Sequence, residues 1–327
     1  MKKKLINKRF TYVALLLIVG IVSFLWSQPV QAQEFPTKPV SVVIPFGPGG
    51  SSDLTFRALI GTAQEFLGQP VVLQLKPGGG GAIATEAIAQ AKPDGYNLLS
   101  GHTSPNSILP AVEGRSRGPD DLAAVCRINI DYGLFLTHQN APFKTFKEMI
   151  AWAKAHPGEL SFGVAGTWSI TEFDWRGIER LAGIKTRIVP YDGGGQALIG
   201  LLGEHIHASL LAVPQSLPQV KAGKLRPLAY EGLKRHVDLP NIPTLKEEGY
   251  DLPVLGAWKG VLAPKKTPRP IIDKLATAFK KMTETEQAKT AIKQLGNEFQ
   301  YLGPDEFEKY WRAEYENYKE LGKIFKN

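Results

Sequence analysis

The stretch Phe35-Pro-Thr-Lys-Pro-Val-Ser-Val-Val-Ile-Pro-Phe-Gly-Pro-Gly-Gly-Ser-Ser-Asp53 contains the pattern that decides the fold of this chain. Its β-branched run Val40–Ile44 predicts a buried strand, and the Gly-rich segment after it predicts a loop that opens a helix. The free backbone N–H groups of such a loop converge on one point, which suits a bound anion. Turn geometry alone also explains the glycines, because glycine adopts positive φ without strain. The stretch therefore predicts an α/β unit and leaves open whether its loop binds a ligand.

The first 32 residues have the three parts of a secretory signal peptide. Val13–Trp26 is apolar, Val30-Gln-Ala32 resembles a cleavage site, and the positive n-region consists of Lys2, Lys3, Lys4, Lys8 and Arg9. The apolar run is shorter than the ~20 residues that span a bilayer, which favours cleavage over a membrane anchor. The sequence therefore predicts an exported chain that is cleaved near Ala32.

Composition excludes several classes of protein. The net charge of the chain is +8, but five basic and no acidic residues lie in the leader, so the mature part carries +3. This small excess does not support a nucleic-acid-binding surface. Cys126 is the single cysteine, so no internal disulfide is possible and the mature chain must rely on a large hydrophobic core. Its length indicates two domains or one large one.

Strand-like and helix-like segments alternate along the mature chain, which predicts parallel α/β sheets. Strands are expected over residues 40–44, 71–75, 97–100, 125–130, 134–138, 160–164, 186–189 and 206–211. Helices are expected over 53–67, 81–91, 145–156 and 305–326, with further helical segments after the later strands. The helix at 145–156 begins with the capping box Thr145-Phe-Lys-Glu148.

Three Gly-rich loops follow predicted strands, namely Pro45–Asp53, Lys76–Gly81 and Tyr191–Gly195. In open α/β sheets, ligands bind beyond the carboxyl ends of the strands. The first and third loops lead into helices, so their backbone amides could hold a carboxylate, and Ser51 and Ser52 could add hydroxyl donors. Plain turn chemistry remains the alternative for each loop.

Other chemistries find less support. The chain has no G-x-x-x-x-G-K-[ST] or G-x-S-x-G motif, and Gly47-Pro-Gly-Gly-Ser-Ser lacks the third glycine of the dinucleotide fingerprint. His205-x-His207 could place two imidazoles on one strand face, but no further metal-ligand motif accompanies it. An exported hydrolase would need a nucleophile–base pair, for which His102 near Ser51 or Ser52 is the candidate. The sequence predicts a protein that is not an enzyme and has no cofactor or metal.

Several motifs in order carry a family resemblance. They are Phe35–Arg57, Lys76-Pro-Gly-Gly-Gly-Gly81, Ala91-Lys-Pro-Asp-Gly-Tyr-Asn-Leu-Leu99, Val189–Gly195, Leu201–His205, Ala222–Ala229 and Leu239–Gly249. Together they resemble the substrate-binding proteins of tripartite tricarboxylate transporters, also called Bug receptors, over essentially the whole mature chain. The resemblance implies a type II periplasmic-binding-protein (Venus flytrap) fold, with two α/β domains, a cleft, and hinge crossings near Ile128–Asp131 and Leu228–Gly232. Domain 1 would comprise residues 33–129 and 231–327, and domain 2 residues 130–230.

The resemblance also implies which residues bind the ligand. Domain 1 would contribute Phe46, Gly49, Gly50, Ser51, Ser52, Asp53, His102, Thr103 and Ser104. Domain 2 would contribute Ala165, Gly166, Thr167, Trp168, Ser169, Tyr191, Asp192 and Gly193. Two helix N-termini, one from each domain, could share one anion and make closure depend on it.

The chain departs from the family pattern at positions that bear on ligand charge. Asp192 stands where relatives often carry lysine, and His102-Thr103 stands where they often carry Thr-Asn. Ala212 replaces a frequent acidic residue and so removes a partner for an α-amino group. Trp168 could stack on an aromatic acid or could serve only as a packing residue. These departures favour a monocarboxylate or aromatic carboxylate over citrate.

The resemblance implies a periplasmic solute receptor that binds a small organic carboxylate. It would deliver this ligand to a membrane permease built from one large and one small subunit. The alternative is a ligand-sensing module that presents the acid to a membrane histidine kinase, which would need the same cleft. The receptor is expected to be a monomer without a nucleic-acid partner.

Overall fold

The computed structural model describes residues 35–252 and 256–326. The predicted signal peptide, residues 1–32, lies outside the described residues. Within the described ranges, no helix combines the length and apolar character that crossing a membrane requires.

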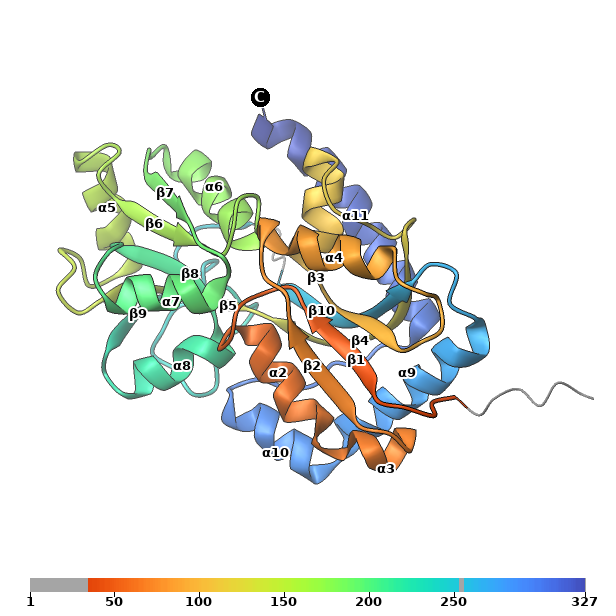
Figure 1. The fold of residues 1–327 in the computed structure, drawn as a ribbon. Helices are drawn as coiled ribbons and strands as arrows, with labels where there is room; N and C mark the ends of the chain where they lie inside the picture. Colours follow the sequence, from red (N-terminus) through yellow and green to blue (C-terminus); the bar gives the residue numbers. More distant parts are fainter. Residues whose placement is uncertain (1–34, 253–255, 327) are drawn as a thin grey trace, which may run out of the picture. The chain divides into compact units, whose positions relative to one another are not determined.

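Two five-stranded sheets organise the described chain (Figure 1), with strand orders β2-β1-β3-β10-β4 and β7-β6-β8-β5-β9. We call each sheet with its helices a lobe. The first sheet consists of β1 (Val40–Ile44), β2 (Val71–Leu75), β3 (Asn97–His102), β4 (Leu122–Asp131) and β10 (Ala257–Pro264). The second consists of β5 (Gly133–His138), β6 (Ser161–Val164), β7 (Arg187–Pro190), β8 (Ala208–Ala212) and β9 (Leu225–Tyr230).

Helices connect and flank these strands. In the first lobe they are α2 (Ser51–Leu59), α3 (Ala63–Leu67), α4 (Ala82–Ala89), α9 (Arg269–Glu284), α10 (Glu286–Gln294) and α11 (Pro304–Lys326). The same lobe has the short helices η1 (Ile60–Thr62) and η2 (Gly79–Gly81) and the wider helix η3 (Ser104–Glu113). In the second lobe they are α5 (Phe146–Ala155), α6 (Ile170–Ala182), α7 (Gly194–Leu202) and α8 (Val213–Lys221).

All eight predicted strands are present, with ends within a few residues of those expected, but the expectation of purely parallel sheets is wrong. Strand β10 pairs antiparallel with both β3 and β4, and β5 pairs antiparallel with β8 and β9. Strands β9 and β10 were not predicted. In β10, Lys259 and Gly260 interrupt the apolar run, and both residues are disfavoured in strands. All eight residues of β10 are nevertheless buried.

Apolar packing stabilises each lobe and also joins the two. In the second lobe, the rings of Phe162 and Trp175 stack with centroids 3.8 Å apart. In the first lobe, Trp258 packs against the rings of Phe307 and Trp311. A further buried cluster combines residues of both lobes, namely Ile108, Val112, Ile170, Phe173, Ala257 and Tyr318. The two lobes therefore share apolar surface through this cluster.

Within the described residues, the chain passes from the first lobe to the second after β4 and stays against the second lobe as far as Leu252. The passage is at Tyr132, between β4 and β5. After β9, the chain stays against the second lobe, because Tyr230 N donates to Pro243 O at 2.8 Å and Leu245 is buried in the core of that lobe. Leu252 also packs against that core. The division into domain 1 (residues 33–129 and 231–327) and domain 2 (residues 130–230) stays a prediction. The contacts made by residues 230–252 favour placing the second domain boundary after Leu252.

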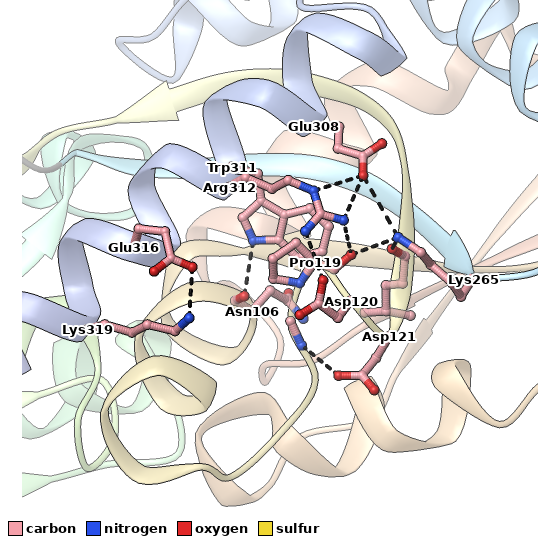
Figure 2. Close-up of polar contacts among 12 residues, drawn as sticks. Asn106, Pro119, Asp120, Asp121, Lys265, Glu308, Trp311, Arg312, Glu316 and Lys319 are labelled. Atoms are coloured by element: carbon pink, nitrogen blue, oxygen red, sulfur yellow. Dashed lines mark hydrogen bonds and ion pairs between the residues drawn. The ribbon is translucent and has the colours of Figure 1, made fainter.

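Helix α11 closes the first lobe by packing against η3 and β4. Figure 2 shows its polar anchors: Trp311 Nε1 donates to Asn106 O at 3.0 Å, and the Arg312 guanidinium bonds Glu308, Asp120 and the carbonyl oxygen of Pro119. The predicted amphipathic helix at 305–326 is confirmed, with Phe307, Trp311 and Tyr318 buried along one side.

Glu314 is a buried carboxyl group on the inner side of α11. Its Oε2 accepts hydrogen bonds from Ser107 Oγ at 2.6 Å and from Trp258 Nε1 at 2.5 Å. Burial raises the pKa of Glu314 to about 7, although these hydrogen bonds and the charge on Arg127 act in the opposite direction. The folded protein therefore holds a proton on Glu314 under conditions in which the unfolded chain has lost it.

Glu314→Gln is expected to flatten the pH dependence of stability. A raised folded-state pKa contributes stability that is complete below the ordinary value of 4.5 and is lost as the pH rises through about 7. In the wild type, Glu314 should lower the free energy of unfolding by up to about 3 kcal/mol over this pH range, and the variant should lack this loss. Urea unfolding at pH 4.5, 6 and 8 measures this difference. Glu316→Gln, at an exposed position on the same helix, is the control, and equal wild-type and Glu314→Gln slopes would contradict the prediction.

Candidate ligand-binding cavity

A cavity of about 70 Å³ lies between the two lobes, beyond the carboxyl ends of strands from both sheets. First-lobe residues on its wall are Phe46, Gly50, Ser51, Ser52, His102, Ser104, Asp131 and Ala257. Second-lobe residues on its wall are Ala165, Ile170, Thr171, Gly194, Leu210, Ala212 and Gln215. This is the position at which open α/β sheets bind their ligands.

Four helices present their first turns to this cavity. Gly50, Ser51 and Ser52 begin α2, Ile170 and Thr171 begin α6, Gly194 begins α7, and Ala212 precedes α8. The N-cap residues of α2, α7 and α8 make no side-chain capping bond. Each helix N-terminus carries a partial positive charge of roughly +0.5. The first N–H groups of three of these helices already have acceptors, since Ser51 N donates to Gln215 Oε1, Ile170 N to Ser104 Oγ and Val213 N to Tyr132 O. The helix dipoles of both lobes therefore favour a negative charge at this cavity.

Direct hydrogen bonds join the lobes at the cavity wall. Ser51 N donates to Gln215 Oε1 at 3.1 Å, and Ile170 N donates to Ser104 Oγ at 3.0 Å. The backbones also approach closely, because a Cβ atom placed on Gly195 would lie 2.8 Å from Pro48 O. Glycine at 195 thus permits the first turn of α7 to pack on the loop before α2.

Asp131, the last residue of β4, is the centre of a buried polar cluster on the cavity wall. Its Oδ2 accepts from Ser51 Oγ and from the ammonium group of Lys259. Its Oδ1 accepts from Asn129 Nδ2 at 2.8 Å and from Asn297 Nδ2. The Lys259 side chain is completely buried, and desolvation lowers its pKa while Asp131 acts to raise it.

His102 lines the cavity as a neutral imidazole. Burial lowers the pKa of His102 to about 3, and the charge on Lys259 acts in the same direction. Its Nδ1 accepts a hydrogen bond from Ser104 N at 3.2 Å, so the ring proton resides on Nε2. The Phe46 ring contacts the His102 ring edge-on at 5.1 Å between centroids. His102 therefore contributes a neutral donor to this wall.

The structure gathers seven of the predicted site residues at the cavity: Phe46, Gly50, Ser51, Ser52, His102, Ser104 and Ala165. Four others, Gly166, Thr167, Tyr191 and Asp192, line a separate outer cavity of about 660 Å³. Gly49 and Asp53 bond each other, since Gly49 N donates to the Asp53 carboxylate at 3.0 Å. All the ligand contacts proposed from sequence remain predictions.

The remaining predicted residues have structural contacts near the cavity. Thr103 Oγ1 accepts from Trp258 N at 3.0 Å, and Ser169 caps α6 by accepting from Glu172 N. Trp168 packs at the cluster that joins the lobes and lies 5.4 Å from the Arg176 guanidinium. A Cβ atom on Gly193 would meet the Phe46 side chain at 3.5 Å.

Sequence reasoning did not select several residues of the cavity wall as ligand contacts. These are Asp131, Ile170, Thr171, Leu210, Ala212, Gln215 and Ala257. Ile170 and Thr171 could have been found, because they start a helix that follows a predicted strand. Asp131 and Gln215 carry no comparable sequence signal, since their approach to Ser51 depends on how the lobes pack.

Two of the residues considered for a hydrolytic pair, Ser51 and His102, have other partners. The Ser51 hydroxyl donates to Asp131, and Nδ1 of His102 is engaged by the backbone of Ser104. The hydroxyl of Ser51 is therefore oriented by a carboxylate of the cavity wall. This arrangement gives no support to the hydrolase alternative.

Comparison with known proteins identifies the family and the fold. The family model for tripartite tricarboxylate transporter family receptors matches residues 55–325. BugT of Bordetella pertussis is 34% identical over 249 residues, which cover 75% of this chain and 76% of BugT. MatC from Rhodopseudomonas palustris, solved with bound malate, has a TM-score of 0.82 and 26% identity over 88% of this chain and 100% of MatC.

A second R. palustris protein, Rpa4515, was solved with adipate and has a TM-score of 0.84. It is 26% identical, and the match covers 89% of this chain and 98% of that protein. The two-lobed periplasmic-binding-protein fold expected from the motifs is thereby confirmed. This chain belongs to the tripartite tricarboxylate transporter receptor family, whose members are solute-binding receptors.

Proposed function

We propose that this protein is a periplasmic receptor that binds a small organic carboxylate between its lobes and delivers it to a tripartite membrane permease. The observation that carries the proposal is the convergence of four helix N-termini on one small cavity. A carboxylate accepts several N–H hydrogen bonds at once and is attracted by each helix dipole. Groups from both lobes would then hold one anion.

The relatives support the ligand class at a coarse level. MatC binds malate and the Rpa4515 protein binds adipate in their solved structures, and both ligands are organic acids. The signal-peptide pattern of residues 1–32 supports export.

The mechanism is a shift in population between open and closed lobes. A ligand held by α2 alone would gain the contacts of one lobe, whereas closure adds the first turns of α6, α7 and α8. The ligand therefore binds the closed form more tightly and draws the protein toward it. Closure also removes water from the cavity, which strengthens the attraction between the helix dipoles and the carboxylate.

A thermal-shift panel on residues 33–327 tests binding. The protein is first unfolded and refolded to remove carried-over ligand, then mixed with mono-, di- and tricarboxylates and with the matching amides. An acid at 100 times its dissociation constant should stabilise the fold by about 2.7 kcal/mol and raise the midpoint by roughly 5–10 °C. The uncharged amides should give no shift. A panel in which acids and amides behave alike would refute carboxylate binding.

Delivery needs a separate test in the organism. Deleting the gene should abolish uptake of the radiolabelled acid that the panel identifies, and a plasmid copy should restore it. Unchanged uptake together with loss of transcription induced by that acid would instead favour the histidine-kinase alternative.

A further inference from the structure

The ammonium group that bonds Asp131 of the cavity wall is already neutralised. Lys259 lies on β10 of the first sheet, paired with His102 of β3 and Asn129 of β4. Its ammonium group bonds Asp131, and none of its side chain is exposed. Lys259 therefore cannot turn toward the ligand without breaking a buried ion pair. Such a break is strongly unfavourable.

Asp131 is equally engaged. A carboxylate has about four acceptor positions. Two donors, Ser51 Oγ and Lys259 Nζ, bond Oδ2, and two more, Asn129 Nδ2 and Asn297 Nδ2, bond Oδ1. Asp131 therefore has no acceptor position left for the ammonium group of an amino acid.

The rest of the cavity offers little to a second charge. Among the described residues that form its wall, there is no arginine or lysine, and His102 is neutral. Phe46, Ile170 and Leu210 make much of the remaining wall apolar, together with Ala165, Ala212 and Ala257. An additional carboxylate would lose its hydration without gaining a countercharge, which is costly. The cavity is also small, at about 70 Å³.

From these contacts we infer that the Asp131–Lys259 pair restricts the cavity to short carboxylates with one negative charge, no ammonium group and an uncharged remainder. The inference rests on the proposed function and names its substrate class. The helix N-termini hold the single carboxylate. Because Lys259 is paired with Asp131, it cannot neutralise a second carboxylate of the ligand. For the same reason, Asp131 cannot neutralise an ammonium group of the ligand.

Isothermal titration of the mature wild-type protein tests the inference with three probes of similar size: propionate, malonate and alanine. Propionate is expected to bind at least about tenfold more tightly than either of the others. Malonate or alanine binding as tightly as propionate would overturn the inference and leave the proposed receptor function standing. Failure of every acid in the wider panel would overturn both.

Asp131→Asn tests the role of the pair directly, because it removes the countercharge of Lys259. The affinity for malonate should rise about tenfold or more relative to wild type. Asp120→Asn is a matched control, since it makes the same change of charge at an exposed residue that pairs with Arg312. Unchanged malonate affinity in folded Asp131→Asn would overturn the inference.

A second variant covers the case in which Asp131→Asn does not fold. Asp131→Asn combined with Lys259→Met removes both charges, so no free cation is created. Malonate should then remain weaker than propionate, as in wild type. Tight malonate binding by this double variant would show that the pair does not set the ligand charge and would overturn the inference.

Discussion

Gly195→Val is expected to weaken binding of the carboxylate ligand about a thousandfold, equivalent to about 4 kcal/mol. A Cβ atom at residue 195 would lie 2.8 Å from Pro48 O and 3.3 Å from Gly50 N. Both atoms are backbone atoms of the first lobe, so they cannot move aside as a flexible side chain would. Valine at 195 should therefore hold the lobes apart and leave the ligand with the contacts of one lobe.

Titration with the acid found in the ligand panel measures this effect. The variant should fold normally, because valine at this position is compatible with the first turn of α7 when the lobes are open. Gly303→Val is the matched control, since a Cβ atom there would meet nothing within 4 Å. Wild-type affinity in Gly195→Val would mean that the approach of α7 to the first loop is not part of the ligand-bound state.

Lys259→Met is expected to lower the free energy of unfolding by about 3–5 kcal/mol, because it leaves the Asp131 carboxylate buried without its countercharge. Asn129 and Asn297 would still donate to Oδ1, but hydrogen bonds from neutral amides compensate a buried charge only in part. Methionine fills a similar volume and adapts to irregular space, so the loss of stability from empty volume should be small.

The double variant Asp131→Asn/Lys259→Met separates charge from packing. It should recover most of the lost stability, because neither charge then needs a partner. Urea unfolding of the wild type, both single variants and the double variant gives the coupling energy of the pair as a double-mutant cycle. Additive losses in the cycle would show that the two side chains do not stabilise each other.

Local sequence patterns predicted the strands and helix ends that depend on residues close together in the chain. The β-branched run at Val40–Ile44 forms β1 with those ends, and Gly68 ends the helical stretch after it with φ +74°. Thr145 caps α5 by accepting from Glu148 N at 3.1 Å, as the capping box predicts. These features depend on side-chain branching, on backbone freedom and on contacts between residues close in the chain.

Part of the candidate cavity could be predicted in the same way. Gly50, Ser51 and Ser52 follow a strand and start a helix, so their place at the sheet edge follows from the α/β pattern. Asp192 has comparable local signals, but it faces the outer cavity. The degree of lobe closure decides which loop residues reach the inner cavity. The sequence pattern does not predict how far the lobes close.

Local sequence patterns specify the alternating strands and helices, the Gly-rich first loop and the family motifs. Long-range packing places β10 in the first sheet between β3 and β4 and brings Lys259 to Asp131. A lysine within a buried strand contradicts local propensity, and it is stable there only because a carboxylate 128 residues away neutralises it. The charge of the cavity wall is therefore a property of long-range pairing, which no local pattern records.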